Sequence, residues 1–257
     1  MTGNYIYIGN SENLPEGKVS WESPSNIALV KYWGKKMEQI PANPSISFTL
    51  NNCKTTTTLS YSNSDELSFE VYVDGKREEG FEPKIKTFFE RISEYSSFIN
   101  KYKFRIDTSN SFPHSSGIAS SASGLSALAL CICSIEQNIN SEFEGELFLN
   151  KASFLARLGS GSACRSLFPK MASWGKHSEL KNSSEFIGTP YDDLHPVFTT
   201  YQDTILLVDK GQKQVSSTVG HGLMLQHPFA EARFEQANSN LSKLREVLKS
   251  GDLIAFN

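Results

Sequence analysis

Small and hydroxyl-bearing residues run directly into an apolar helical pattern between Asn110 and Leu130, NSFPHSSGIASSASGLSALAL. The first backbone N–H groups of a helix lack intrahelical partners and carry partial positive charge, so a phosphate can bind there. Small residues let the anion approach the backbone closely. The stretch therefore predicts a phosphate-binding helix mouth. Gly117, Ala119, Ala122 and Gly124 meet this need for small residues, and Ser120 and Ser121 add hydroxyl donors.

A plainer interpretation of the same stretch is helix capping. Serine is among the best N-cap residues, so Ser120 and Ser121 are equally suited to ending the helix without any ligand. The Gly-x4-Gly-Lys-Ser/Thr pattern of a P-loop does not occur in the sequence. His114, in the turn, could contact a nucleotide or simply pack. The serine pair alone leaves both interpretations open.

A second candidate segment is LARLGSGSACRSLF, which contains Arg165 after a run of small residues. A guanidinium group presents a rigid fork of donors that pairs bidentately with a carboxylate. The preceding loop, Ser160 to Cys164, could surround a substrate with backbone and hydroxyl donors. Two alternatives are a solvated surface arginine and a nucleophilic Cys164, although no histidine or acid stands beside that cysteine in the sequence.

A third segment, SPSNIALVKYWGKK, places Lys31 and Lys35 four residues apart. If this stretch is helical, both lysines lie on one face. In any conformation they are two cations within reach of one anion. The alternative is a solvated lysine pair with Tyr32 and Trp33 in the core.

Composition restricts the classes of partner. The 257 residues, 39% hydrophobic and 21% charged, fit one large domain or two packed halves. A net charge of −3 gives no basic excess for nucleic acid or an anionic membrane. The four cysteines lack metal-ligand spacing, and no metal site is predicted. No signal peptide is visible, and the apolar run Leu125–Cys133 is shorter than the roughly 20 residues that span a bilayer. We expect a cytoplasmic protein.

Periodicity predicts strands mixed with helices without regular alternation, which favours an α+β fold. Asp74-Gly75 indicates a turn, and the polar stretch Lys176–Asp193 indicates an approximate boundary between two parts of the chain. The predicted strands are Thr55–Tyr61, Leu67–Val73, Lys101–Thr108, Lys170–Lys176, Asp203–Lys210 and Lys213–Thr218. The predicted helices start at Pro83 and Phe229 and cover Ser120–Ile135 and Phe148–Leu158, with a further element from Asp252.

The stretch FPHSSGIASSASG resembles the phosphate-binding motif of the GHMP kinase superfamily, which includes galactokinase, homoserine kinase, mevalonate kinase and phosphomevalonate kinase. The ATP contacts that this resemblance implies are Ser116, Gly117, Ile118, Ala119, Ser120 and Ser121. Four other segments resemble the diphosphomevalonate decarboxylase family in order and spacing: Ser23–Lys35, Asn43–Leu50, Gly159–Phe168 and Val215–Gly220. The resemblance implies a GHMP-type two-part fold. Residues 1–180 would form an N-terminal ribosomal-S5-domain-2-like half that binds ATP and substrate. Residues 181–257 would start a C-terminal α+β half, which we expect to be truncated.

The resemblance implies ATP-dependent conversion of (R)-5-diphosphomevalonate to isopentenyl diphosphate, by phosphorylation of the 3-hydroxyl and loss of phosphate and carbon dioxide. This step belongs to isoprenoid, and so lipid, biosynthesis; the family also implies a homodimer and Mg²⁺ carried with ATP. Lys31 and Arg165 would be catalytic, near the hydroxyl and on the carboxylate. Lys84 is predicted as a further cation near the diphosphate. The other implied substrate contacts are Asn26, Tyr32, Trp33, Gly34, Lys35, Ser160, Gly161, Ser162, Ala163, Cys164, Ser217 and Thr218.

One family feature is missing from these 257 residues. The family's general base is an aspartate in an Asp-Ala-Gly-Pro-like turn, which does not occur here, so we expect this aspartate beyond residue 257. Two alternatives therefore stay open. One is a related 3-hydroxyl kinase that does not decarboxylate, and the other is a binding fragment that lacks the base. Release of carbon dioxide would indicate a decarboxylase, whereas a stable 3-phosphate would indicate the 3-hydroxyl kinase.

Overall fold

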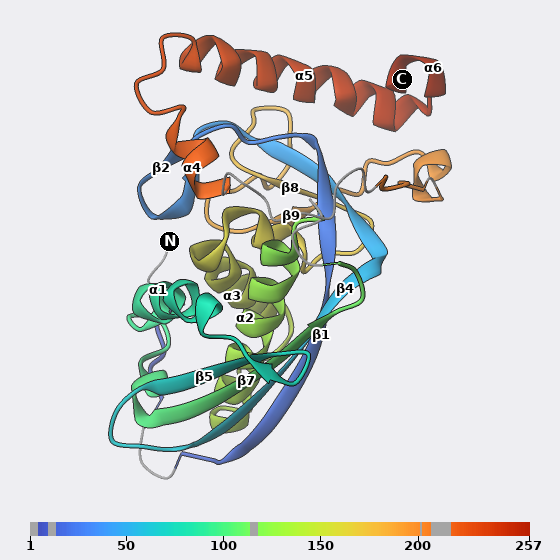
Figure 1. Cartoon of the computed structure of the whole chain (residues 1–257). Coiled ribbons are helices and arrows are strands. Elements are labelled where there is room, and N and C mark those ends of the chain that lie inside the picture. Colours follow the sequence, from blue (N-terminus) through green and yellow to red (C-terminus); the bar gives the residue numbers. More distant parts are fainter. Residues whose placement is uncertain (1–4, 10–13, 114–117, 201, 207–216) are drawn as a thin grey trace.

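The computed structural model describes residues 5–9, 14–113, 118–200, 202–206 and 217–257. One mixed sheet carries helices on one face, and a long helix lies across one end of the molecule (Figure 1). The strands are β1 (Gly17–Val30), β2 (Lys35–Lys36), β3 (Ile40–Pro41), β4 (Ser45–Asn63), β5 (Ser68–Val73), β6 (Lys76–Arg77), β7 (Tyr102–Asn110), β8 (Met171–Trp174) and β9 (Thr189–Pro190). The α-helices are α1 (Glu82–Ile92), α2 (Ser120–Ile139), α3 (Gly145–Gly159), α4 (Ser217–Gly222), α5 (Ala230–Ser250) and α6 (Leu253–Phe256). Short 3₁₀ turns are η2 (Met37–Gln39), η3 (Glu79–Phe81), η4 (Ser97–Lys101), η5 (Gly161–Arg165) and η6 (Pro196–Thr199).

The main sheet has the order β6-β5-β7-β4-β8-β9, and β1 also pairs with β4. Only the β5–β7 pair is parallel among these ladders; the others are antiparallel. β2 and β3 form a separate small hairpin. The long strand β4 therefore connects the two ends of the sheet, because its first residues pair with β8 and its last with β7.

The β1–β4 ribbon is interrupted where the candidate site lies. Pro24 is opposite Lys54, but the next residue, Ser25, is opposite Leu50. Such an irregularity bends a strand and redirects its side chains, and it commonly occurs beside functional sites. Proline fits here because it has no N–H to contribute to the ladder.

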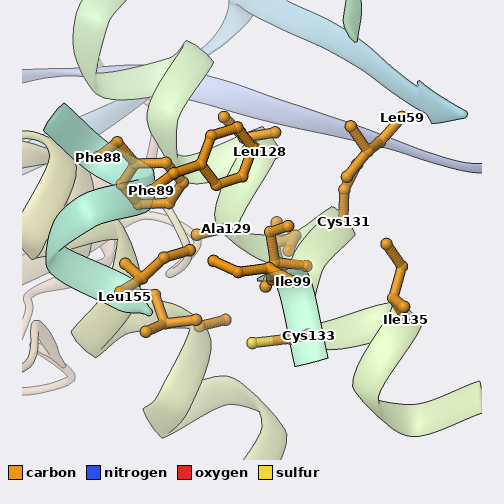
Figure 2. Packing of buried hydrophobic residues seen from close by; sticks show 14 of the residues in the cluster. Leu59, Phe88, Phe89, Ile99, Leu128, Ala129, Cys131, Cys133, Ile135 and Leu155 are labelled. Atoms are coloured by element: carbon orange, nitrogen blue, oxygen red, sulfur yellow. The ribbon is translucent and has the colours of Figure 1, made fainter. Parts of the chain in front are cut away.

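The main core lies between the sheet and helices α1, α2 and α3. Alternation on β7 turns Tyr102, Phe104 and Ile106 inward, as expected for a strand with one buried face. Figure 2 shows the meeting point, where Leu128 of α2 faces Phe88 and Phe89 of α1. Each such side chain contributes about 1.5–3 kcal/mol when fully buried. This packing fixes where α2 begins.

A smaller core holds the long helix α5. Three of its buried side chains, Ala237, Leu241 and Leu248, pack with Ile46 and Met171 of the sheet. The helix ends at Gly251, which has a positive φ of 79° as a C-terminal glycine often does. The rest of α5 is largely exposed along the top of Figure 1.

One helix in the described part of the chain, α2, is long and apolar enough to span a membrane by length and composition. Within the protein, 72% of that window is buried. Its apolar side chains thus belong to the main core.

The mixed α+β fold predicted from the sequence is confirmed. The predicted helices correspond to α1, α2, α3 and α5, and Asp74-Gly75 forms the β5–β6 turn. The prediction of a strand over Asp203–Lys210 is wrong for its described part, since residues 203–206 form no strand. Lys213–Ser216 lie outside the described residues, and the predicted strand does not continue through Ser217, where helix α4 begins. The division of the chain at residue 180 stays a prediction.

Candidate active site

Among the described residues, no side chain caps the mouth of α2. Ala119 precedes the helix with a left-handed backbone (φ 54°, ψ 43°), and it makes no capping hydrogen bond. A non-glycine residue in this region is uncommon, and such residues gather at functional sites. Ser120 and Ser121 are the first helical residues rather than the cap. Helix capping therefore does not account for these serines.

Two contacts hold this mouth in place. From β1, the Ser25 hydroxyl donates to the carbonyl of Ile118. From α1, Lys84 Nζ donates to Ser121 Oγ at 2.7 Å. Lys84 thus places a positive charge beside the uncapped N–H groups. Next to them lies an apolar cavity that also reaches the inner face of the sheet, lined by residues that include Val71, Val73, Phe81, Ile85, Ile106, Ser120 and Ser121.

Arg165 is buried, with 2% of its surface exposed, so the alternative of a solvated arginine is wrong. Its guanidinium donates through Nε to Ser47 Oγ at 2.8 Å, through Nη1 to Ser45 Oγ, and through Nη2 to Asn26 Oδ1 at 3.3 Å. No carboxylate of the described residues forms an ion pair with it. Burial lowers the pKa of Arg165 from its usual value. A cation surrounded by neutral acceptors is the environment that a carboxylate ligand would complete.

Asn26 connects the arginine loop to the sheet. While its Oδ1 accepts from Arg165, its Nδ2 donates to Ser166 Oγ at 2.8 Å and to the Ser162 carbonyl at 3.2 Å. The neighbouring Ser23 donates to Ser126 of α2 at 2.8 Å. Residues 23–26 of β1, which begin the third sequence segment, therefore contact both the helix mouth and the arginine loop and bring all three segments together.

The end of the third segment continues into what we call the lysine arm (Lys31–Gln39), which follows β1 directly. The part that carries both lysines is not helical: Lys31–Gly34 has no regular structure and Lys35 begins β2. The side chain of Asn43 holds its start, because Nδ2 donates to the Lys31 carbonyl at 3.0 Å and Oδ1 accepts from the Trp33 N–H at 2.9 Å. These bonds satisfy the backbone groups that a helix would otherwise use.

Tyr32 anchors the arm to the core. Its ring lies edge-on to Trp174 at 4.9 Å and stacks on His221 of α4 at 4.4 Å. Burial raises the pKa of the Tyr32 hydroxyl. His221 Nδ1 also lies 2.9 Å from the Trp33 carbonyl. The alternative that these aromatic residues pack in the protein is therefore correct for Tyr32, which is buried.

Lys35 projects into a positive environment. Burial, together with the nearby cations Arg91 and Lys84, lowers the pKa of its amine to about 8. No ion pair between Lys35 and an acid is formed within the described ranges. Three cations, Lys35 from β2 and Lys84 and Arg91 from α1, thus act on one region, and a polyvalent anion would relieve their repulsion.

The Gly-Ser loop (Ser160–Arg165) is packed too tightly for larger residues. A side chain on Gly161 would place its Cβ 2.5 Å from the Trp174 ring. Cys164 is fully buried, its Sγ lies 3.0 Å from the Gly161 carbonyl, and burial raises the pKa of its thiol to about 12. The thiol stays protonated at neutral pH, so Cys164 is not an activated nucleophile.

Comparison with known proteins agrees with this geometry. Residues 23–185 match the family model described as a diphosphomevalonate decarboxylase-like N-terminal domain. The chain is 34% identical to a diphosphomevalonate decarboxylase of Danio rerio and 30% identical to one of Rattus norvegicus, with 82% of this chain covered in both. The chain belongs to the diphosphomevalonate decarboxylase-like family.

The chain spans about half the length of these family members, 53% in each case. Solved structures of the family are also similar. A mevalonate diphosphate decarboxylase from Legionella pneumophila has a TM-score of 0.73 and 30% identity over 93% of this chain and 73% of that one. A structure described as MDDEF in complex with MVAPP, AMPPCP and magnesium has a TM-score of 0.74 and 26% identity over 94% and 71% of the two chains.

Most of the predicted site residues lie in one region of the structure, and a few lie outside the described residues. The contacts above connect Asn26, Lys31 to Lys35, the Gly-Ser loop and Ile118 to Ser121. Ser116 and Gly117 lie outside the described residues, as does His114. Ser217 and Thr218 start the backbone of α4, but their side chains are outside the description.

Several site residues were not identified by sequence reasoning. Asn43, Ser45 and Ser47 lie in Asn43–Leu50, a segment that resembles the family but whose residue types do not by themselves indicate a role. Small polar residues alternating along a strand beside an aromatic-lysine motif could have suggested them. His221 gave no such signal, because its contact with Tyr32 spans 189 positions of sequence.

Proposed function

We propose that the protein of which this chain is all or part catalyses the ATP-dependent decarboxylation of 5-diphosphomevalonate. In this reaction the γ-phosphoryl group of ATP passes to the tertiary 3-hydroxyl. The resulting C–O bond then breaks, inorganic phosphate leaves, and the electron pair of the departing carboxylate forms the new double bond. The products are ADP, phosphate, carbon dioxide and isopentenyl diphosphate. Phosphorylation is needed because hydroxide is a poor leaving group.

The observation that carries this proposal is the environment of Arg165. A buried guanidinium whose described partners are two hydroxyls and an amide oxygen is an electrostatically incomplete site. It has five N–H donors, and the three contacts above use three of them, which leaves two for a ligand. A carboxylate matches that remaining fork in charge and geometry. Arg165 would hold the substrate carboxylate in a fixed orientation before it leaves.

The opposite end of the substrate and the nucleotide need other cations. We assign the ATP phosphates to the uncapped mouth of α2, where Lys84 and Ser121 add a charge and a hydroxyl. The apolar cavity beside this mouth suits the base of the nucleotide. Magnesium would arrive with ATP as part of the substrate. The binding of MVAPP, AMPPCP and magnesium by a related protein supports this assignment.

Lys31 and Lys35 complete the proposal on the substrate side. Lys35, with the nearby Arg91 and Lys84, would balance the charge of the diphosphate. Lys31 lies at the start of the arm and would be close to the 3-hydroxyl, where negative charge is transferred. Catalysis of phosphoryl transfer depends mostly on such positioning and charge stabilisation.

We also propose a cytoplasmic homodimer, in which the free thiols Cys53, Cys131, Cys133 and Cys164 stay reduced. Sedimentation equilibrium of the purified protein tests the dimer. A monomer at micromolar concentration would exclude it.

The decisive experiment follows both products of the full-length protein with diphosphomevalonate labelled at the carboxyl carbon. We expect ATP-dependent release of labelled carbon dioxide together with ADP. Accumulation of a labelled 3-phosphate would instead favour a kinase without decarboxylation. If neither product forms while the substrate binds, the decarboxylase proposal is wrong for this protein.

A further inference from the structure

The reaction proposed above gives no role to a second buried arginine, Arg157 in the last turns of α3. Its exposed fraction is 2%, and burial lowers its pKa. No described carboxylate lies within ion-pair distance of its guanidinium. A buried charge without a partner acid is unfavourable unless its donors are well used. The hydrogen bonds that the guanidinium donates therefore explain best why an arginine is buried at position 157.

Arg157 uses its donors on two separate loops. Nε donates to the Phe186 carbonyl at 2.8 Å, and Nη1 donates to the Glu38 carbonyl. The guanidinium also lies over the Phe154 ring at 4.9 Å and the Phe186 ring at 5.8 Å, which fixes its plane. A planar fork with five donors can bridge two carbonyls in this way, whereas an apolar side chain of the same size cannot.

The Glu38 carbonyl belongs to the tip of the lysine arm. Glu38 and Gln39 both have left-handed backbones, with φ of 53° and 64°. Two consecutive non-glycine residues in this region form a strained turn that persists only when its surroundings hold it. The described contacts on this turn include the guanidinium of Arg157, from a different element.

The arm is thus held at both ends. Asn43 binds the backbone at Lys31 and Trp33, and Arg157 binds the turn after Lys35. Between these points Lys35 reaches the region of Arg91 and Lys84.

The same face of α3 also holds the Gly-Ser loop. Ser153, one helical turn before Arg157, donates to the Cys164 carbonyl at 3.0 Å and accepts from the Gly188 N–H at 2.9 Å. One face of α3 therefore sets the lysine arm and the arginine loop relative to each other.

We infer that Arg157 is a positioning residue that fixes the lysine arm, and with it Lys35, against the Gly-Ser loop. This role rests on the proposed function for its biological meaning, because Lys35 would then meet the substrate diphosphate at a set distance from Arg165. The anchoring itself depends only on the contacts above. Arg157 touches neither substrate nor nucleotide in this proposal.

The first test measures the arm directly in the purified protein. Trypsin cleavage after the exposed Lys36 reports opening of the arm. Competitive acetylation of Lys35 as a function of pH reports whether its amine stays in the buried, positive environment. In Arg157→Met we expect cleavage to be at least tenfold faster. At pH 8 we expect Lys35 acetylation to fall at least tenfold, because a released amine returns towards its ordinary pKa.

Arg157→Lys keeps the charge but can bridge the two carbonyls only poorly, so we expect it to restore part of the wild-type behaviour. The matched control is the double variant Lys151→Met, Glu136→Leu. It removes the other buried cation of α3 together with its partner acid, six residues from Arg157, and Lys151 makes no hydrogen bond to the arm among the described residues. If the control changes cleavage and acetylation as much as Arg157→Met does, or if Arg157→Met stays within twofold of wild type, the inference is wrong.

The second test links the arm to the site through the binding of diphosphomevalonate, measured by calorimetry. We expect Arg157→Met to weaken binding at least fivefold and the control double variant to bind within twofold of wild type. Unchanged affinity in an Arg157→Met protein whose arm is demonstrably released would overturn the positioning role. If wild type itself does not bind diphosphomevalonate, the proposed function fails, while cleavage and acetylation still decide whether Arg157 anchors the arm.

Discussion

Two regions of the molecule bury a cation in opposite ways. Between α2 and α3, Lys151 pairs with Glu136 at 2.6 Å and also donates to the Tyr95 carbonyl at 2.9 Å. Beside β1 and β4, Arg165 is equally buried, but its described partners are neutral. The first region is complete as it stands. The second lacks one negative charge, and the difference separates a structural cation from one prepared for a ligand.

The comparison also explains why burial alone does not identify a site. The side chains of both cations are almost inaccessible, and both are held by hydrogen bonds. What distinguishes them is whether a carboxylate of the protein satisfies the charge. The same criterion places Arg157 in a third class, because its donors are used on the backbone of two loops.

The largest expected effect is on the stability of the protein and concerns Lys151, the cation that pairs with Glu136. Lys151→Met leaves the buried Glu136 without its partner, so we expect the free energy of unfolding to fall by about 3–5 kcal/mol. Urea denaturation followed by circular dichroism measures this change. Adding Glu136→Leu should recover most of the loss, because two apolar side chains can fill the same space. A double variant as unstable as the single variant would contradict the interpretation of Lys151 as a structural cation.

Arg165, the cation without a partner acid among the described residues, should show the reverse pattern, in which substitution weakens ligand binding more than it lowers the free energy of unfolding. Arg165→Lys removes the bidentate fork, and we expect it to weaken binding of diphosphomevalonate by about 2–5 kcal/mol. Its effect on unfolding should be smaller than that of Lys151→Met, since no acid of the described chain is left unpaired. Calorimetry and urea denaturation on the same preparation compare the two quantities. Binding within twofold of wild type would remove Arg165 from the site.

The sequence predicted the elements that depend on local patterns. Helices α1, α2, α3 and α5 were evident because their apolar periodicity is contained within each segment. The strand β1 was not, since its inner and outer residues alternate poorly around Pro24. The spacing of Lys31 and Lys35, just after β1, is compatible with a helix, and only the contacts of Asn43 with Lys31 and Trp33 show why these residues do not form one.

The sequence suggested a ligand where a residue type favours one kind of anion, as for Arg165 and the helix mouth, and these ligand roles stay predictions. The partners that give Arg165 its character were not predictable, because Ser45 and Ser47 are 120 and 118 positions away. Without these contacts a buried arginine and a surface arginine have the same sequence signature. The burial of Cys164, which excludes it as a nucleophile, was hidden for the same reason.

The pH dependence of binding tests whether Lys35 is also a cation that awaits a ligand, as we propose for Arg165. The pKa of Lys35, about 8, lies below its ordinary value. The amine is charged below this pH and loses its charge as the pH rises through it. Substrate phosphates are already ionised there. We therefore expect affinity for diphosphomevalonate to fall above pH 8, by up to about tenfold per pH unit. Lys35→Met should bind weakly with little dependence on pH between 7 and 9.5. A wild-type affinity that is flat over this range would exclude contact between Lys35 and the diphosphate.

The smallest expected effect lies at the helix mouth, where the ligand meets backbone groups that no substitution removes. Ser121→Ala deletes a hydroxyl that accepts from Lys84, and we expect it to weaken ATP binding by about 0.5–1.5 kcal/mol. Ser134→Ala is a matched control on the same helix, because that hydroxyl accepts from Trp21 far along α2. Calorimetry with a non-hydrolysable ATP analogue measures both variants. Equal losses would show that Ser121 acts through helix stability, whereas a loss confined to Ser121→Ala places the phosphates at the uncapped end of α2.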